Sequence, residues 1–320
     1  MSNGGDRLEQ AQNGVRPETF RGFCEIREDL NVKPDAILFH NADYSKNKRL
    51  RDLLSTRDPN VPFVLWSLES PSNDGYRPEA NVINWTMTYR RDADIFAPYG
   101  EMVKLKQKAE IDFDEIWSWK TKSATWLGSN CHPRNGRMDL IRKMIEKGLQ
   151  IDVWGACGKP PPICAGLDKQ GQPCVAELIR PYKFYIALEN SNCKHYVTEK
   201  FWKSLNDRFA VPIVLARKYY RELGVPDSAY IAIDDFRSLD EFVKFVKKVE
   251  NDEELYMSYH KWRTDYKVIA GDGFLGFCEL CKVLQYPEEV SKRRNSYSNL
   301  SNWHNMQLCD NSIAQKYLAK

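Results

Sequence analysis

The chain has 320 residues, which exceeds the size to which a single hydrophobic core usually grows, so its length favours two domains. Hydrophobic residues make up 42% of the chain and aromatic residues 12%, which excludes a wholly disordered protein. The 47 basic and 44 acidic residues leave a net charge of +3, which gives no electrostatic reason to expect a nucleic-acid-binding or membrane-surface protein.

Residues 1–20 lack the apolar segment of a signal peptide and are expected to form a flexible leader. No run of residues is apolar enough to span a bilayer, so a membrane anchor of the natural protein would have to lie upstream of this sequence. Nine cysteines and two Asn-x-Ser/Thr sequons favour the secretory pathway. The sequons make Asn84 and Asn299 candidate glycosylation sites.

The first half of the chain predicts a small α/β layer. Residues 36–40 and 62–67 are apolar runs of strand length, and a stretch rich in Lys, Arg and Asp separates them. Residues 101–122 are charged and contain no strong strand pattern, so we expect them to connect the two halves. The first domain is accordingly predicted over residues 21–122.

The second half alternates strands and helices more clearly. Strands are predicted at residues 124–128, 151–154, 184–188 and 211–215, and helices at 136–147 and 199–206 and after Ser238. Thr198 stands where the second of these helices needs an N-cap. This alternation predicts a parallel sheet with helices on both faces. The second domain is predicted over residues 123–290, followed by a tail over 291–320.

Two cations stand where strands lead into helices, namely Arg137 and Lys200. A cation in the first turn opposes the helix dipole, which makes sense if a multiply charged anion such as a nucleotide diphosphate binds there. Alternatively, both side chains simply reach solvent. Glu69 directly follows the strand at 62–67, and such a carboxylate can be a general base or an ordinary surface residue.

The sequence offers little for a metal ion. Asp92-x-Asp94 has the spacing of a metal-binding pair, but both residues adjoin Arg90 and Arg91, which we expect to pair with them. Cys278-x-x-Cys281 can be half of a zinc site or part of a disulfide framework, and disulfides are favoured in a secretory protein. No metal site is therefore predicted. The candidate disulfide cysteines are Cys24, Cys157, Cys164, Cys174, Cys278 and Cys281.

Three segments together resemble the α1,3/4-fucosyltransferases of glycosyltransferase family 10, in their metazoan Golgi form. Tyr182-Lys-Phe-Tyr-Ile-Ala-Leu-Glu-Asn-Ser191 and Tyr196-Val-Thr-Glu-Lys-Phe-Trp202 resemble the donor-binding signature. Glu69-Ser-Pro-Ser72 resembles the acceptor-side signature, and residues 84–100 resemble a third block that often carries the same sequon. The order and spacing of the three segments also fit, and the resemblance covers residues 36–281.

The resemblance implies a GT-B architecture, with two Rossmann-like domains and a cleft between them. It implies transfer of L-fucose from GDP-β-L-fucose to the 3-hydroxyl of a GlcNAc in a glycan or glycoprotein, with inversion and without a required cofactor; a divalent cation would be at most stimulatory. It places the enzyme in the Golgi lumen as the catalytic part of a type II membrane protein. By the same resemblance Glu69 is the base and Glu199 lies near the fucose ring. The implied donor-binding residues are Arg137, Tyr182, Lys183, Glu189, Asn190, Ser191, Tyr196, Thr198 and Lys200.

The chain departs from the family in two places. Residues 206–210 replace a small, glycine-containing turn, and the Pro- and Cys-rich loop at 157–174 looks specific to this chain. In the family the C-terminal Cys-x-x-Cys commonly ties back to the first domain. Because Cys24 is the sole cysteine before Cys131, at most one such tie can form from Cys278 or Cys281. Core and antennal GlcNAc both stay open as acceptors, as do another sugar nucleotide as donor and a catalytically silent glycan-binding role.

Overall fold

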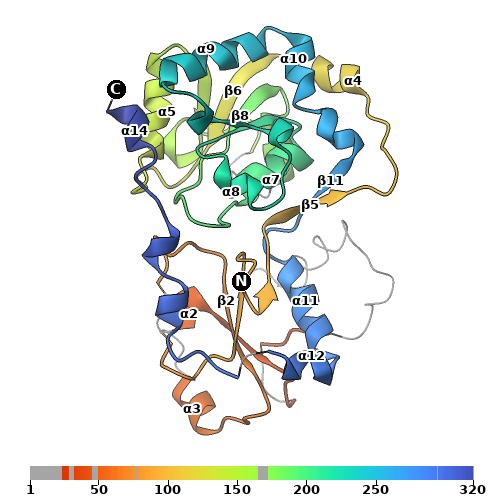
Figure 1. Cartoon of the computed structure of the whole chain (residues 1–320), viewed down its shortest axis with the longest axis vertical. Helices are drawn as coiled ribbons and strands as arrows, with labels where there is room; N and C mark the ends of the chain where they lie inside the picture. Colours follow the sequence, from red (N-terminus) through yellow and green to blue (C-terminus); the bar gives the residue numbers. More distant parts are fainter. Residues whose placement is uncertain are drawn as a thin grey trace. The chain divides into compact units, whose positions relative to one another are not determined.

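The computed structural model describes residues 24–28, 32–44, 50–75, 78–164, 172–293 and 295–319, so the predicted leader lies outside the described residues. The chain divides into two compact units, one running up to Tyr99 and including Gly271–Leu308, the other comprising Gly100–Ala270 and Cys309–Lys320. Figure 1 shows the α/β make-up of each unit. Among the described helices, none has the length and apolarity needed to cross a bilayer.

The first unit contains a four-stranded parallel sheet in the order β1-β2-β3-β4. Both faces of this sheet are covered, which is why its strands are nearly continuous apolar runs. Phe63 and Leu65 point into one buried cluster, and Val64 and Met87 into another. The strands are β1 (Ile37–His40), β2 (Phe63–Ser67), β3 (Trp85–Thr88) and β4 (Ile95–Phe96).

The chain segment Gly271–Leu308 belongs to the first unit, whereas the sequence placed residues 271–290 in the second domain. Helix α11 packs here because Gly276 lets it approach the sheet closely: a Cβ on Gly276 would stand 2.4 Å from that of Ala97. A Cys24–Cys281 disulfide fastens the same helix. The helices of this unit are α2 (Asn41–Tyr44), α3 (Leu50–Ser55), α11 (Leu275–Leu284), α12 (Pro287–Ser291), α13 (Leu300–Trp303) and η5 (Met306–Leu308).

The second unit is built on a five-stranded parallel sheet in the order β10-β9-β8-β6-β7. The chain runs from β6 outward to β7 and then returns to the other side of β6 as β8, so the strand order reverses between β6 and β8. Ligands of such sheets bind at the carboxyl ends of the strands beside this reversal. The strands are β6 (Lys122–Leu127), β7 (Ile151–Trp154), β8 (Tyr182–Ile186), β9 (Val211–Val214) and β10 (Ile231–Ala232).

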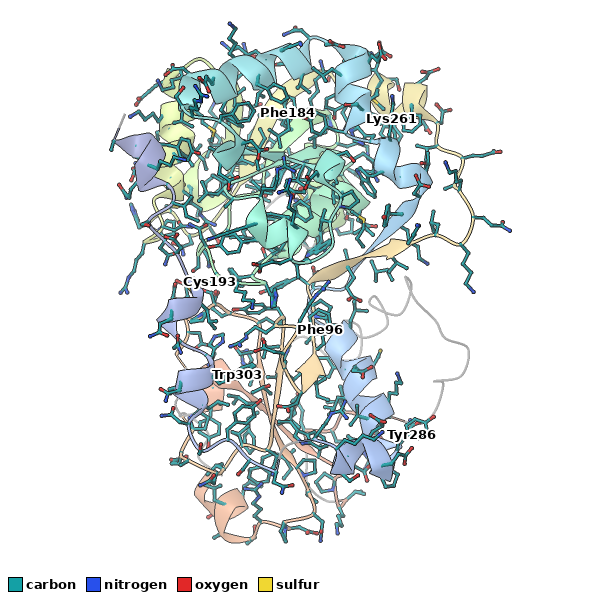
Figure 2. The ribbon with its side chains drawn as sticks, in the orientation of Figure 1. Phe96, Phe184, Cys193, Lys261, Tyr286 and Trp303 are labelled. Atoms are coloured by element: carbon teal, nitrogen blue, oxygen red, sulfur yellow. A yellow bond between two sulfur atoms is a disulfide. The ribbon has the colours of Figure 1, made fainter. Side chains whose placement is uncertain are left out.

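The helices of the second unit confirm the predicted alternation. Helix α5 (Arg137–Glu146) buries Leu140, Ile141 and Met144 against the sheet, and Figure 2 shows Phe184 of β8 in the interior of the same unit. Ser238 caps α9 as expected, because its side chain accepts from the Glu241 amide. The other helical elements are α4 (Phe113–Ser118), η1 (Gly155–Cys157), α6 (Pro173–Ile179), α7 (Glu199–Asn206), α8 (Lys218–Arg221), η2 (Asp227–Ala229), η3 (Ile233–Asp235), α9 (Leu239–Glu250), α10 (Glu253–Ser258), η4 (Lys261–Thr264) and α14 (Gln315–Leu318).

A two-stranded antiparallel ribbon of β5 (Gly100–Lys104) and β11 (Tyr266–Ala270) completes the second unit. The sequence predicted no strand at residues 101–122, and this was wrong for β5. The strand is stabilised by a partner more than 160 positions away and by close packing, since a Cβ on Gly100 would lie 2.4 Å from the Trp202 ring. Neither contact leaves a local signature in the sequence.

Four disulfides join described cysteines: Cys24–Cys281, Cys131–Cys157, Cys164–Cys174 and Cys193–Cys309. The sequence allowed at most one tie from the Cys-x-x-Cys pair to Cys24, and Cys281 makes that tie. Cys278, also a candidate, is an exposed free thiol in this structure. The sequence did not single out Cys131, Cys193 and Cys309, whose partners are settled by tertiary contacts.

Candidate active site

Two loops meet at the carboxyl ends of β6 and β8, where the strand order of the second unit reverses. Residues 128–136 lead from β6 into α5, and residues 187–198, here called the donor loop, lead from β8 into α7. The Asn135 side chain joins the two loops by donating to the Glu189 carbonyl at 2.7 Å. This edge is where an α/β sheet of this topology presents its ligand site.

Arg137 begins α5 and is only 2% exposed. The preceding Gly136 takes a left-handed backbone conformation (φ 72°), which turns the chain sharply from the loop into the helix. The guanidinium donates to the carbonyls of Leu188 (3.1 Å) and Asn130 (2.9 Å). Its buried Nε has no hydrogen-bond partner within the described part of the chain, so this donor is unsatisfied.

Lys200 lies in the first turn of α7, and its amino group is surrounded by oxygen atoms. The Nζ stands 3.2 Å from Glu189 Oε2 and 2.9 Å from Glu199 Oε1, and it donates to Thr198 Oγ1 at 2.8 Å. The side chain of Lys200 is 14% exposed, that of Glu189 is 5% exposed and that of Glu199 is 20% exposed. Charge in this group is therefore fixed in a poorly solvated place.

The pKa values of these groups follow from burial and mutual charge. Burial alone lowers the pKa of Lys200, but the carboxylates of Glu189 and Glu199 outweigh it and raise that pKa above its usual value. Burial raises the pKa of Glu189 despite the nearby Lys200. For Glu199 burial also acts upward, but the charge of Lys200 prevails and lowers the pKa. Lys200 stays cationic at neutral pH, and Glu199 stays anionic.

Thr198 occupies the N-cap position of α7, as predicted, but its side chain makes no capping hydrogen bond. Its Oγ1 instead donates to Glu189 Oε2 at 2.7 Å, and its amide donates to Glu189 Oε1 at the same distance. The Thr198 hydroxyl does not cap the helix because the buried carboxylate of Glu189 needs hydrogen bonds from both the hydroxyl and the amide of Thr198. The first-turn amides of α7 thus lack a side-chain cap at the end of the helix that favours anions.

The remaining predicted residues of the donor loop line the same region. Ser191 is fully buried and Tyr196 nearly so, and both border a small pocket beside the donor loop. Asn190 buries a side-chain Oδ1 that finds no partner among the residues the structure describes. An orphaned acceptor here and the orphaned Nε of Arg137 are the kind of groups that a polar ligand satisfies.

Tyr182 and Lys183, also predicted as donor-binding residues, lie apart from this cluster. They begin β8, so about 15 Å of strand separates them from the donor loop at its other end. The Tyr182 hydroxyl donates to Asp152 Oδ2 at 2.5 Å, and the Lys183 amino group donates to the Glu250 carbonyl at 2.6 Å. Tyr182 and Lys183 are part of the continuous sequence motif because β8, which they begin, leads directly into the donor loop.

Two buried basic side chains lie at the opposite end of α7. Lys120, 5% exposed, donates to the carbonyls of Arg180 (2.6 Å) and Arg208 (3.2 Å), and Arg263 donates to the Leu205 carbonyl at 2.7 Å. The carbonyls of Leu205 and Arg208 lie at or just beyond the C-terminal turn of α7, where its dipole favours positive charge, whereas Arg180 ends α6. Burial, with help from neighbouring arginines, lowers the pKa of Lys120 to about 6.

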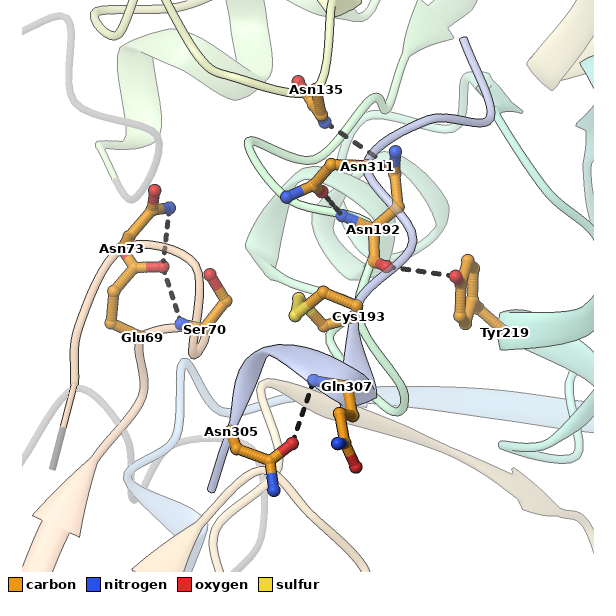
Figure 3. Close-up of a disulfide and its surroundings, with 11 residues drawn as sticks. Glu69, Ser70, Asn73, Asn135, Asn192, Cys193, Tyr219, Asn305, Gln307 and Asn311 are labelled. Atoms are coloured by element: carbon orange, nitrogen blue, oxygen red, sulfur yellow. Dashed lines mark hydrogen bonds between the residues drawn. A yellow bond between two sulfur atoms is a disulfide. The ribbon is translucent and has the colours of Figure 1, made fainter. Parts of the chain in front are cut away.

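Glu69 lies in the first unit, two residues after β2. Its Oε1 accepts from the Ser70 amide at 2.7 Å and from Asn73 Nδ2 at 3.2 Å, which holds the carboxylate in a tight turn (Figure 3). The Tyr99 hydroxyl donates to the Leu68 carbonyl at 2.7 Å and steadies the chain before it. The side chain is half-buried, so it is oriented while still accessible.

Asp92 and Asp94 are engaged within the first unit. Arg90 forms a forked ion pair with Asp92, as the sequence led us to expect. The Asp94 carboxylate instead accepts from Tyr297 (2.6 Å) and from the Thr86 amide (2.8 Å). Across the described residues, no group of three or more His, Cys, Asp or Glu side chains is arranged to hold a metal ion.

The two sequon asparagines differ in environment. Asn84 is half-buried, its Oδ1 accepts from the Phe63 amide at 2.7 Å, and its Nδ2 donates to the Asn295 carbonyl. Asn299 is exposed and caps α13 with its side-chain oxygen. A glycan needs the amide nitrogen to face solvent, and this favours Asn299.

Three residues of the site escaped the sequence analysis: Asn135, Asn192 and Tyr219. Asn135 joins the two loops, while Tyr219 on α8 donates to the Asn192 carbonyl at 3.0 Å. Asn192 and Tyr219 also border the pocket. Asn135 and Asn192 could have been suspected, because each stands in a predicted strand-to-helix loop, but Tyr219 carries no such signal.

Comparison with known proteins bears on the family of this chain. Residues 117–303 match the C-terminal pattern of glycosyltransferase family 10 (fucosyltransferase), and residues 15–100 match the fucosyltransferase N-terminal pattern. The chain is 56% identical to the α-(1,3)-fucosyltransferase fut-6 of Caenorhabditis elegans, over 93% of this chain and 77% of that protein. It is 42% identical to fut-5 of the same nematode, over 94% of this chain and 80% of that protein.

A crystal structure of an α1,3-fucosyltransferase with GDP-fucose aligns over 82% of this chain and 94% of its own length, at 16% identity and a TM-score of 0.47. The extent of the family match and the identity to the nematode enzymes define the class: the protein is a glycosyltransferase. More narrowly, it belongs to glycosyltransferase family 10, the fucosyltransferases.

Proposed function

We propose that this protein transfers L-fucose from GDP-β-L-fucose to the 3-hydroxyl of a GlcNAc residue in a glycan, with inversion at the fucose anomeric carbon. The observation that carries the proposal is the pair of cations at the reversal of strand order. Arg137 and Lys200 lie in the first turns of α5 and α7 there, and the Arg137 loop and the donor loop are joined directly. The α-(1,3) linkage is supported by the names of the nematode relatives.

The diphosphate of the donor is proposed to bind between these two cations. Its negative charges would take the unused Nε of Arg137, the amino group of Lys200 and the uncapped start of α7. Glu199 stays ionised beside Lys200, which supports a role in accepting a hydrogen bond from a fucose hydroxyl. Ser191 and Tyr196 line the pocket proposed for the donor, and Asn190 beside them offers an unsatisfied oxygen. Glu189 and Thr198 hold Lys200 in position.

In the proposed reaction the acceptor oxygen attacks the fucose anomeric carbon from the face opposite GDP. The new carbon–oxygen bond forms as the bond to the phosphate oxygen breaks, and its electron pair leaves with GDP. The acceptor hydroxyl gives its proton to Glu69, which the Ser70 amide and Asn73 hold in orientation. Because GDP is a weak base, it needs neutralising charge more than a proton, and two fixed cations supply that charge in the transition state.

The proposal leaves any divalent cation at most a stimulatory part, because Arg137 and Lys200 already provide positive charge for the diphosphate. It also places the enzyme in the Golgi lumen. Four disulfides and an exposed sequon at Asn299 support an oxidising, glycosylating compartment.

The decisive experiment measures GDP release and product linkage with wild type and with Glu69→Gln, using core N-glycan and lactosamine acceptors. We expect α1,3-linked fucose on one of them, and loss of kcat by about 10²-fold or more in Glu69→Gln, the usual contribution of a general base. GDP should bind both proteins equally, since Glu69 takes no part in donor binding. A wild type that binds UDP or CMP in preference to GDP, or that turns over no glycan acceptor, would overturn the proposal.

A further inference from the structure

The donor loop is fastened by a segment from the far end of the chain. Residues Cys309, Asp310 and Asn311, here called the strap, follow the first unit's last residue and lie along the loop. Cys309 forms a disulfide with Cys193 in the middle of the donor loop, across a sequence separation of 116 residues. The same two cysteines pair as an isolated antiparallel bridge, so the backbones are aligned as well as covalently joined.

Asn192 concentrates the polar contacts between loop and strap (Figure 3). Its amide donates to Asn311 Oδ1 at 2.9 Å, and its carbonyl accepts from the Asp310 amide at 2.8 Å and from the Tyr219 hydroxyl at 3.0 Å. Asn192 is 6% exposed and Cys193 1%, so these hydrogen bonds are shielded from water. Breaking them would leave buried backbone groups unpaired, which is costly.

The strap is itself anchored on the helix that carries Arg137. Beyond it, α14 packs against α5, where Lys143 donates to the Leu318 carbonyl at 2.8 Å and Tyr317 is 2% exposed (Figure 1). The packing is tight at the start of α5, because a Cβ on Gly136 would lie 3.3 Å from the Leu318 side chain. One terminal segment thus touches both loops that provide the cations.

The donor loop has reason to need such support. It buries the carboxylate of Glu189, and His195 holds a left-handed backbone conformation (φ 62°) that is unfavourable for a residue with a side chain. It runs for about twelve residues without regular structure between β8 and α7. Without support, a loop of this length and polarity would sample many conformations. The entropy lost on ordering it would then weaken ligand binding.

We propose that the strap is a positioning element that holds the donor loop in its binding conformation before the sugar nucleotide arrives. Asn192, fixed by the strap, forms part of the pocket wall together with Tyr219. The Cys193–Cys309 disulfide and the Asn311 side chain therefore act on donor affinity, with no contact to the reacting atoms. This inference rests on the proposed function, since it assumes a donor nucleotide at the loop.

The test compares GDP binding by calorimetry in wild type, in Cys193→Ala with Cys309→Ala, and in the matched control Cys164→Ala with Cys174→Ala. The control also loses one disulfide of the second unit, but not one on the donor loop. We expect the first pair to weaken GDP binding and raise the donor KM by about tenfold, because ordering one or two loop residues costs about one factor of ten in affinity. The acceptor KM should not change, and the control should bind GDP like wild type.

Asn311 provides a second, gentler test that decides the matter if the cysteine variant does not fold. Asn311→Ala removes the acceptor for the Asn192 amide and should weaken GDP binding, whereas Asn311→Asp keeps an oxygen there and should restore it. Unchanged GDP affinity in a folded cysteine variant, or equal loss in the Ala and Asp variants, refutes the strap. Failure of wild type to bind GDP would instead refute the proposed function, and the strap with it.

Discussion

Replacing Lys200 with Met probes the electrostatic core of the proposed mechanism. The change removes the charge but keeps a side chain of similar length. At an effective dielectric constant of about 20, a charge 3 Å away attracts with about 5 kcal/mol before desolvation is subtracted. Nζ stands at about that distance from both Glu189 and Glu199. The variant therefore loses the cation that lowers the pKa of Glu199 and partly offsets the burial of Glu189, and we expect one of the two carboxylates to take up a proton.

The catalytic consequence is larger than the structural one. Loss of one preorganised charge at a developing anion typically lowers kcat by about 10²–10³-fold, or 2.7–4 kcal/mol of transition-state stabilisation. We expect this loss in the turnover of GDP-fucose, together with weaker binding of GDP. The assay is continuous GDP release at saturating acceptor, well below the melting temperature of the variant.

A suitable control is Lys244→Met, which removes an equal charge from an exposed position on α9. This variant should keep both kcat and GDP affinity. Circular dichroism would establish that the Lys200 variant is folded. A folded Lys200→Met variant that kept kcat within about threefold of wild type would show that Lys200 is not assigned correctly to the leaving group. A threefold loss is smaller than the loss caused by removing one pre-organised hydrogen bond.

Two further predictions concern stability and modification. Between the native pKa of Lys120 (about 6) and its unfolded value of about 10.4, the unfolded chain binds one more proton, so this group makes stability rise with pH by about 1.4 kcal/mol per unit. The free energy of unfolding, measured with urea from pH 6.5 to 8.5, should therefore rise less steeply for Lys120→Met than for wild type. Equal slopes for the two proteins would contradict the lowered pKa of the buried Lys120 amine. In protein secreted from eukaryotic cells, Asn299→Gln should abolish a glycosidase-sensitive mass, whereas Asn84→Gln should leave it; the reverse result would mean that Asn84 is not held as the structure has it.

Local patterns in the sequence were enough for the parallel sheet of the second unit and the helices around it. The runs that predicted strands at 151–154 and 211–215 lie within a residue of β7 and β9, and the helix predicted at 199–206 has the bounds of α7. These elements are buried on both faces or amphipathic, so their periodicity is strong. The same patterns located Arg137 and Lys200 at the starts of helices, because strand, loop and helix follow one another directly in the chain.

Long-range contacts were beyond the sequence. Strand β5 depends on β11, and Gly271–Leu308 joins the first unit through close packing at Gly276. Tyr182 and Lys183 belong to the same motif as the donor loop, yet they lie at the amino-terminal end of β8, whereas the loop follows its carboxyl end. Linear proximity is a poor guide to a site when an extended strand lies between the residues.

By itself, then, the sequence determined the fucosyltransferase family, the alternating architecture of the second unit and the residues that place charge at its helix starts. The tertiary structure decided which carboxylates surround Lys200, that Thr198 serves Glu189 instead of α7, and that Cys193 is bound to the far end of the chain. The physical reason is the same in each case. A buried charge or an irregular loop is stabilised by whichever group the fold brings beside it, and that neighbour has no fixed separation in the sequence.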